Sequence, residues 1–143
     1  MIPAQDIEAG QLPAACDPHS PPGNHVTALI DTYFRHWNAK DAAEIWSRIY
    51  RLDPGHRLGS EADLRQLLDN TIAGGWGHST LDAISVHPCG PGAWLARIAY
   101  TRFSTDGSVL PPTNRLGAYV VSETGDGLRI TALPLAGRPI ISA

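Results

Sequence analysis

The spacing of apolar residues changes near residue 76, and this change restricts the possible folds more than any other feature. Before it, Val26, Ile30, Tyr33 and Trp37 recur at the three- and four-residue steps that line one face of a helix. After it, residues 93–104 alternate between two sets of side chains, as the two faces of a strand require. Helices followed by a meander of strands predict an α+β fold, with helices packed on one face of a mainly antiparallel sheet.

Capping and turn residues predict where these elements begin and end. Asn24 is expected to cap the first helix, and Asp41 with Glu44 has the spacing of a capping box for a short second helix. A third helix is expected to open at Ser60 and to stop at the glycine pair 74–75. Strands are expected at 81–86, 93–104, 115–122 and 128–135, with a break at 87–92 after the first of them.

Residues 1–23 are expected to form a proline-rich arm, and residues 24–143 a single domain. Five of the twelve prolines lie in the arm, which has no sustained apolar period. This composition fits a mobile or loosely docked extension, and it also fits a functional lid.

The distribution of charge argues against nucleic acid as a partner. The chain has 14 acidic and 11 basic residues, and three of the acids but none of the bases lie in 1–23, so the domain itself is balanced. A balanced domain lacks the basic surface that phosphate binding requires. No apolar run approaches the roughly 20 residues of a membrane span, and the first residues lack the pattern of a secretory signal. We therefore expect a cytoplasmic protein with no membrane partner.

Metal and cofactor motifs are not evident in the sequence. Cys16 and Cys89 are too few for a disulfide framework, and the six histidines do not supply the spacing of a zinc centre. The sequence contains no Gly-x-Gly-x-x-Gly fingerprint and no P-loop. We therefore expect a protein without a metal or cofactor.

The run Tyr33-Phe34-Arg35-His36-Trp37-Asn38-Ala39-Lys40-Asp41 carries a resemblance to a known family. It resembles the end of the first helix and the Asn-Ala-x-Asp start of the second in the nuclear transport factor 2-like superfamily. That group includes ketosteroid isomerases, scytalone dehydratase, limonene epoxide hydrolase and SnoaL-type polyketide cyclases. The order of elements over residues 24–135 resembles the same family. The resemblance implies an α+β cone, in which three helices pack on a strongly curved sheet, and a homodimer that pairs the outer sheet faces.

The ketosteroid isomerase pattern implies roles for two residues of this chain. Tyr33 matches the first-helix tyrosine that donates a hydrogen bond to the substrate oxyanion, and Asp53 matches the catalytic base of an Asp-Pro pair. The second acid of that pattern would fall at Leu116 or Gly117, so it is missing. The residues also have plainer interpretations, because Tyr33 can be a core aromatic and Asp53 a turn former.

Further candidates come from the strands and the aromatic residues. His78 stands at the start of the first long strand, where scytalone dehydratase-like proteins place a pocket histidine, although a surface histidine would fit equally well. An arginine that points inward from a strand would anchor a carboxylate. Tryptophans can line an apolar cavity, or they can pack in the core or at a dimer interface. The predicted substrate-binding residues are Trp37, Tyr50, Trp76 and Arg115.

These residues predict a cofactor-independent acid–base enzyme of the isomerase, dehydratase or cyclase type, acting on a small apolar carbonyl compound. Tyr33 would polarise the carbonyl oxygen, Asp53 would move the proton, and His78 would act as a second relay. The alternative is a non-catalytic module of the same fold that binds a small ligand or only dimerises. The two hypotheses differ in whether Tyr33, Asp53 and His78 converge on one enclosed pocket.

Overall fold

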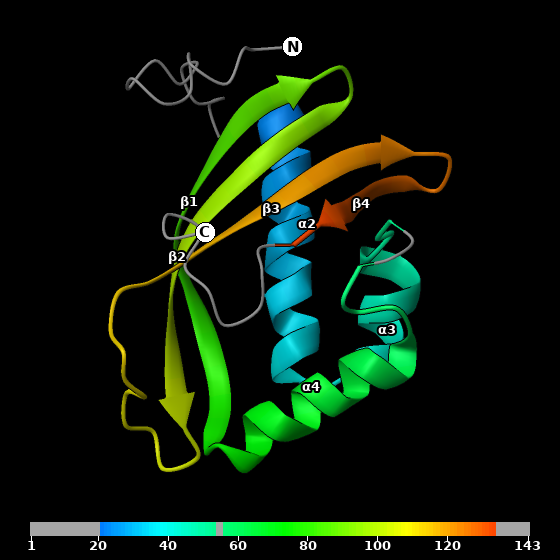
Figure 1. Ribbon diagram of the computed structural model, residues 1–143. Helices are drawn as coiled ribbons and strands as arrows, with labels where there is room; N and C mark the ends of the chain where they lie inside the picture. The colour runs from blue at the N-terminus through cyan, green and yellow to red at the C-terminus, as the bar shows by residue number, and fades with distance from the viewer. Residues whose placement is uncertain (1–20, 54–55, 134–143) are drawn as a thin grey trace.

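The computed structural model describes residues 21–53 and 56–133, and these form three helical segments and one sheet (Figure 1). A π-helical turn, η1, continues the short second helix. The elements are α2 (Pro21–Asn38), α3 (Ala42–Glu44), η1 (Ile45–Ile49), α4 (Glu61–Ala73), β1 (Trp76–Gly90), β2 (Ala93–Ser104), β3 (Arg115–Thr124) and β4 (Gly127–Ala132).

The four strands pair in sequence order as an antiparallel meander, β1-β2-β3-β4. Three register shifts interrupt the pairing of β1 with β2, and such bulges increase the bend and twist of a sheet. At the other edge, Tyr50 forms an isolated parallel bridge with Ile130, which ties the segment after η1 to β4. Three helices on a curved antiparallel sheet confirm the predicted α+β class.

Two helix starts follow the predicted caps. The Asp41 carboxylate accepts a hydrogen bond from the Glu44 amide at 3.2 Å, and the Ser60 hydroxyl accepts one from the Asp63 amide at 3.2 Å. The break before α3 turns at Lys40, whose φ of 59° lies in the left-handed region. These local signals therefore position α3 and α4 as the sequence predicts.

Two predicted elements have the wrong boundaries, the first helix and the first strand. The first helix begins at Pro21, inside the range assigned to the arm, so Asn24 lies within the helix and is not its cap. Proline suits a first turn, because the amide that it lacks would have no helical partner there. The strand expected at 81–86 is too short at both ends, because β1 begins at Trp76 and continues through the expected break to Gly90. An edge strand tolerates Pro88, and the register shift between Pro88 and Gly90 absorbs the irregularity.

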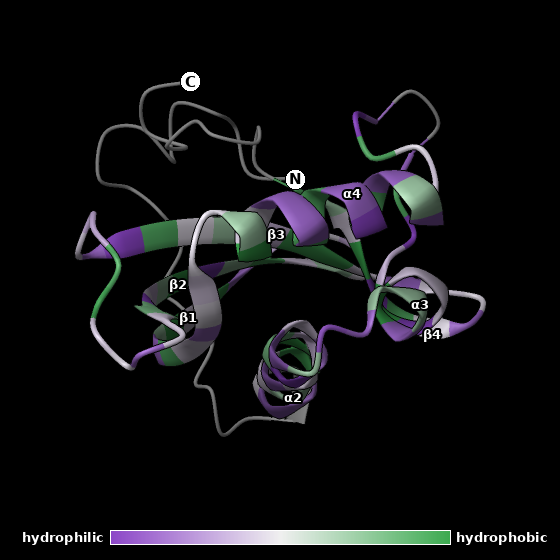
Figure 2. Cartoon of the chain, turned by 90° about the horizontal axis from the view of Figure 1, so that it is seen from below, coloured by the Kyte–Doolittle hydropathy of each residue, from purple (hydrophilic) through white to green (hydrophobic). Residues whose placement is uncertain are grey.

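The core lies between the inward face of α2 and one face of the sheet. Figure 2 shows α2 nearly end-on beside the sheet. Fully buried side chains come from α2, η1, α4 and all four strands, and β2 contributes Ala96. This burial confirms the apolar face that the sequence predicts for the first helix, and it supplies the main free energy of folding. The largest fully buried side chains are Ile30, Ile45, Leu64, Ile130, Val26, Val86 and Val121.

Candidate functional site

A pair of buried tyrosine hydroxyls lies in the interior of the fold. The Tyr33 and Tyr50 hydroxyl oxygens are 2.6 Å apart, and the two residues come from α2 and from the segment after η1. Tyr119 of β3 completes the cluster, with its ring centroid 5.4 Å from that of Tyr33 in an edge-on arrangement. Three separate elements therefore bring three phenol groups together, which we call the tyrosine cluster.

Burial keeps the tyrosine cluster neutral. Loss of hydration raises the pKa of Tyr33, Tyr50 and Tyr119 well above the usual value for a phenol, because a phenolate is poorly solvated in the interior. The mutual proximity of the phenols adds to this rise for Tyr33 and Tyr119. The Trp37 indole lowers the pKa of Tyr33 and Tyr50 by a smaller amount. At physiological pH all three groups are therefore hydrogen-bond donors.

The hydroxyl pair has one O–H proton that its own hydrogen bond does not use. Each phenol carries one O–H proton, and the hydrogen bond between Tyr33 and Tyr50 uses one of the pair's two protons. The Tyr119 hydroxyl also interacts with Tyr33 as a donor, so it uses its own proton and none of the pair's. The nearby Trp37 indole is a donor only and cannot accept the second proton. The second proton therefore has no acceptor in residues 21–53 and 56–133, and the pair can donate it to an oxygen from outside them.

The aromatic residues predicted to bind substrate lie beside this pair. The Trp37 ring centroid lies 6.3 Å from that of Tyr33 and 6.1 Å from that of Trp76. Trp76 is only 2% exposed, and its indole N–H donates to the Ser79 hydroxyl at 2.9 Å. Trp37, Tyr50 and Trp76 therefore form a connected aromatic wall with Tyr33.

Arg115 lies at the start of β3 and pairs directly with Tyr100 of β2. The Tyr100 ring contacts Phe34 of α2 at a centroid distance of 5.9 Å, so the two residues lie on the sheet face that α2 covers. The Arg115 Nη2 donates to the Pro111 carbonyl at 2.9 Å. Arg115 therefore lies on the same sheet face as the tyrosine cluster.

The structure does not bring Asp53 and His78 together with Tyr33. The Asp53 side chain is exposed, next to the undescribed residues 54–55. His78 is also exposed, and its ring stacks on Phe103 at a centroid distance of 4.7 Å. Neither residue takes part in any of the ring contacts or hydrogen bonds of Tyr33. The catalytic roles assigned to Asp53 and His78 stay predictions.

Tyr119 is the residue of the tyrosine cluster that sequence reasoning missed. Its pairing with Ala96 places it on the buried face of β3, but the sequence of a strand does not say which of its two faces points inward. The position of the family's second acid is near it: a Cβ on Gly117 would lie 3.5 Å from the Tyr119 hydroxyl. A neutral phenol therefore lies close to where the resemblance would place a carboxylic acid.

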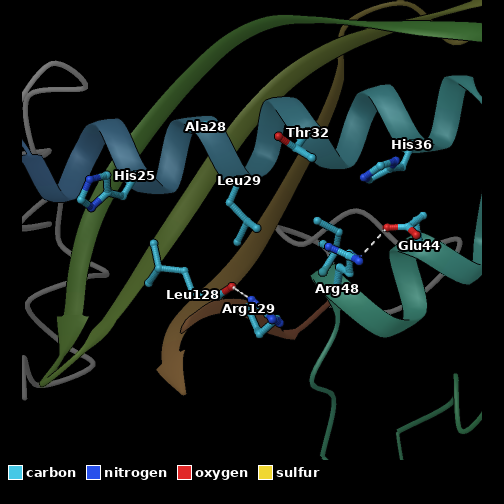
Figure 3. A pocket seen from close by; sticks show the side chains of 10 residues that line it. His25, Ala28, Leu29, Thr32, His36, Glu44, Arg48, Leu128 and Arg129 are labelled. Carbon is cyan, nitrogen blue, oxygen red and sulfur yellow. Dashed lines mark hydrogen bonds and ion pairs between the residues drawn. The ribbon is translucent and has the colours of Figure 1, made fainter. Parts of the chain in front are cut away.

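A separate, open groove of about 580 Å³ lies between α2, η1 and β4 (Figure 3). His25, Leu29 and His36 of α2 face Arg48 of η1 and Arg129 of β4 across it. The Arg48 and Glu44 side chains form an ion pair of 3.0 Å and are 73% and 39% exposed, so water and salt screen their charges. The groove is a weaker candidate than the tyrosine cluster, because its polar groups stay hydrated.

Two searches of the described residues bear on other kinds of site. In residues 21–53 and 56–133, no group of three His, Cys, Asp or Glu side chains is placed to hold a metal ion. Within the same ranges, no helix has the length and apolar character needed to cross a membrane.

Comparison with known proteins gives matches among solved structures only. No protein-family profile matches the chain, and no curated protein matches it either. A nuclear transport factor 2-like superfamily protein from Salmonella enterica is 17% identical, with a TM-score of 0.51 over 81% of this chain and 95% of that one.

Two further structures are similar to this chain. A provisionally named aromatic ring hydroxylase from Novosphingobium aromaticivorans is 17% identical, with a TM-score of 0.55 over 76% of this chain and 82% of its own. A provisionally named calcium/calmodulin dependent protein kinase II association domain from Xanthomonas campestris is 13% identical, with a TM-score of 0.54 over 85% and 88%. Identities this low establish architecture and leave chemistry open. The chain has the nuclear transport factor 2-like fold.

Proposed function

We propose that the chain is a small-molecule-binding module, in which Tyr33 and Tyr50 donate a hydrogen bond to the carbonyl oxygen of an apolar ligand. The observation that carries the proposal is the buried hydroxyl pair at 2.6 Å, which keeps one O–H proton without an acceptor among the described residues. Burial makes such a donor effective, because no water competes for it in a low-dielectric interior. Trp37 and Trp76 supply flat apolar surface next to the pair.

Binding is a better match to this geometry than acid–base catalysis. Proton abstraction requires a general base within hydrogen-bond reach of the substrate. Within the described residues, the ring contacts and hydrogen bonds of the tyrosine cluster include no carboxylate and no imidazole. One similar structure is named as an aromatic ring hydroxylase, which supports an aromatic compound as the ligand to try first.

The proposal is tested by titrating the chain with acetylnaphthalene, a flat ketone, and following tryptophan fluorescence. Tyr33→Phe and Tyr50→Phe should each weaken binding about fivefold, because a neutral hydrogen bond contributes about 1 kcal/mol. Tyr100→Phe is the matched control, since that hydroxyl has no hydrogen-bond partner within the described residues and stands outside the pair. Equal affinity of all three variants and the wild type would contradict the proposal.

We also propose that two copies associate through the sheet face opposite α2. Leu116 is 62% exposed on this face, next to its β2 partner Ala99, which itself pairs with Ala83 of β1. Burial of this side chain against a second copy would remove its apolar surface from water and so stabilise a dimer. One similar structure is named as an association domain, which is consistent with oligomerisation. Leu116→Lys should lower the mass measured by light scattering to that of one chain, 15.3 kDa. A wild-type mass equal to one chain would contradict the dimer.

A further inference from the structure

The sheet register places two arginines on the face that α2 covers. Arg115 lies directly opposite Tyr100, whose ring contacts Phe34 of α2. Arg102 follows Tyr100 by two residues, and side chains two apart in a strand share a face. The two arginines are therefore diagonal neighbours on β2 and β3, a separation that long side chains bridge.

Neither arginine has an acidic partner in the part of the chain that the structure describes. The ion pairs of residues 21–53 and 56–133 involve Arg35, Arg48, Arg51 and Arg65. Arg102 instead lies over an aromatic face, with its Cζ 5.9 Å from the Tyr100 ring centroid. Two positive side chains at diagonal positions repel each other where no carboxylate stands between them, and a bound anion would offset that repulsion.

Arg115 also has a buried donor without a partner. Its Nη2 donates to the Pro111 carbonyl, but its Nε is buried and makes no hydrogen bond. A buried N–H without an acceptor is destabilising, and native structures contain few of them. By contrast, Arg97 lies on the opposite face of β2 and is exposed, so water satisfies its donors.

We infer that the ligand of this module is a small organic carboxylate, held through its charged end by Arg102 and Arg115. The inference rests on the proposed function, because the same ligand would carry its carbonyl to the tyrosine hydroxyls. Arg102 is close enough to Tyr119 for its charge to lower the pKa of that phenol, against the larger effect of burial. Tyr119 in turn contacts Tyr33 at 5.4 Å, so the arginine pair and the hydroxyl pair form one continuous site. The bidentate geometry of guanidinium suits a carboxylate.

The test compares two ligands that differ in one group, acetylnaphthalene and the corresponding acetylnaphthoate. The wild-type chain should bind the carboxylate about tenfold to a hundredfold more tightly, as expected for hydrogen bonds to a charged group. Arg102→Gln and Arg115→Gln should each remove most of that preference, measured as the ratio of the affinities for the carboxylate and the ketone. Arg115→Lys keeps the charge but loses the fork of donors, so it should recover only part of the preference. Arg97→Gln, on the same strand as Arg102 but on the opposite face, should change neither affinity.

The outcomes separate this inference from the proposed function. The carboxylate inference would be overturned if the wild type bound both ligands equally, or if its preference survived in both glutamine variants. The affinity for the ketone would still test the hydrogen bond from the tyrosine pair. Binding of neither ligand to the folded chain would overturn both proposals. Circular dichroism of each variant establishes that it is folded, and Arg97→Gln, on the opposite face, provides the matched control for the loss of one arginine.

Discussion

Replacing Tyr33 by phenylalanine removes one oxygen atom from the buried hydroxyl pair and leaves the Tyr50 hydroxyl without that partner. The bond is short, at 2.6 Å, and Tyr33 and Tyr50 are each only 5% exposed, so water cannot take the missing place. The lost hydrogen bond and the unsatisfied hydroxyl should together lower the free energy of unfolding by about 1–3 kcal/mol. The double variant Tyr33→Phe/Tyr50→Phe should lose less than the sum of the single variants, because neither hydroxyl is then left alone.

The free energy of unfolding is measured by urea titration with tryptophan fluorescence, since Trp37 lies against Tyr33. With a slope of about 1–3 kcal/mol per molar urea for a domain of this size, the transition of each single variant should move down by about 0.5–2 M. Tyr100→Phe controls for the loss of a hydroxyl outside the pair. Single variants as stable as the wild type, or strictly additive losses in the double variant, would refute the coupling between the two hydroxyls.

Three further predictions concern sites outside the hydroxyl pair. Asp53→Asn should leave ligand affinity unchanged because the side chain is exposed, whereas a fall of about 10²–10⁴ in turnover of any substrate would identify Asp53 as the general base of the enzymatic hypothesis. Gly77→Ala should lower the Tm, because the new Cβ would lie 2.9 Å from the Ser104 carbonyl oxygen and force a backbone shift. The control Gly125→Ala should leave the Tm unchanged, because its Cβ would have no atom within 4 Å. Hydrogen bonds from neighbouring serines, of which Ser104 has the largest effect, lower the pKa of Asp106 to about 2. The stabilising contribution of this carboxylate is therefore present above about pH 4 and is lost as the pH falls through about 2. An NMR titration of Asp106 with a midpoint near 4 would contradict this.

The sequence predicts those parts of the fold that local chemistry controls. The caps at Asp41 and Ser60 act through their own side chains on amides three residues away, so a short window contains all the necessary information. The strand at 93–104 lies between two turns, and the alternation of its residues matches the observed bounds. The end of β1 was not predictable in this way, because Pro88 is tolerated only by an edge strand and the order of strands is a tertiary property.

The candidate site was predictable only in part, for a similar reason. Tyr33 lies on a helix whose buried face is evident from its period, and the aromatic neighbours on and near that helix followed from it. Tyr119 and Arg102 lie on strands, where a shift of one residue exchanges the two faces, so the register was needed to place them. Asp53 matched a motif in sequence, but the path of the chain after Tyr50 leaves its side chain in solvent.

The central claim is that the Tyr33–Tyr50 pair donates a hydrogen bond to a ligand carbonyl. The most direct measurement is the infrared stretching frequency of acetylnaphthalene labelled at its carbonyl and bound to the chain. Bound to the wild type, the carbonyl should absorb at a lower frequency than in an apolar solvent, because a hydrogen bond weakens the C=O bond. In Tyr33→Phe/Tyr50→Phe the frequency should return to the apolar value. A bound carbonyl that already absorbs at the apolar frequency in the wild-type chain would contradict the claim.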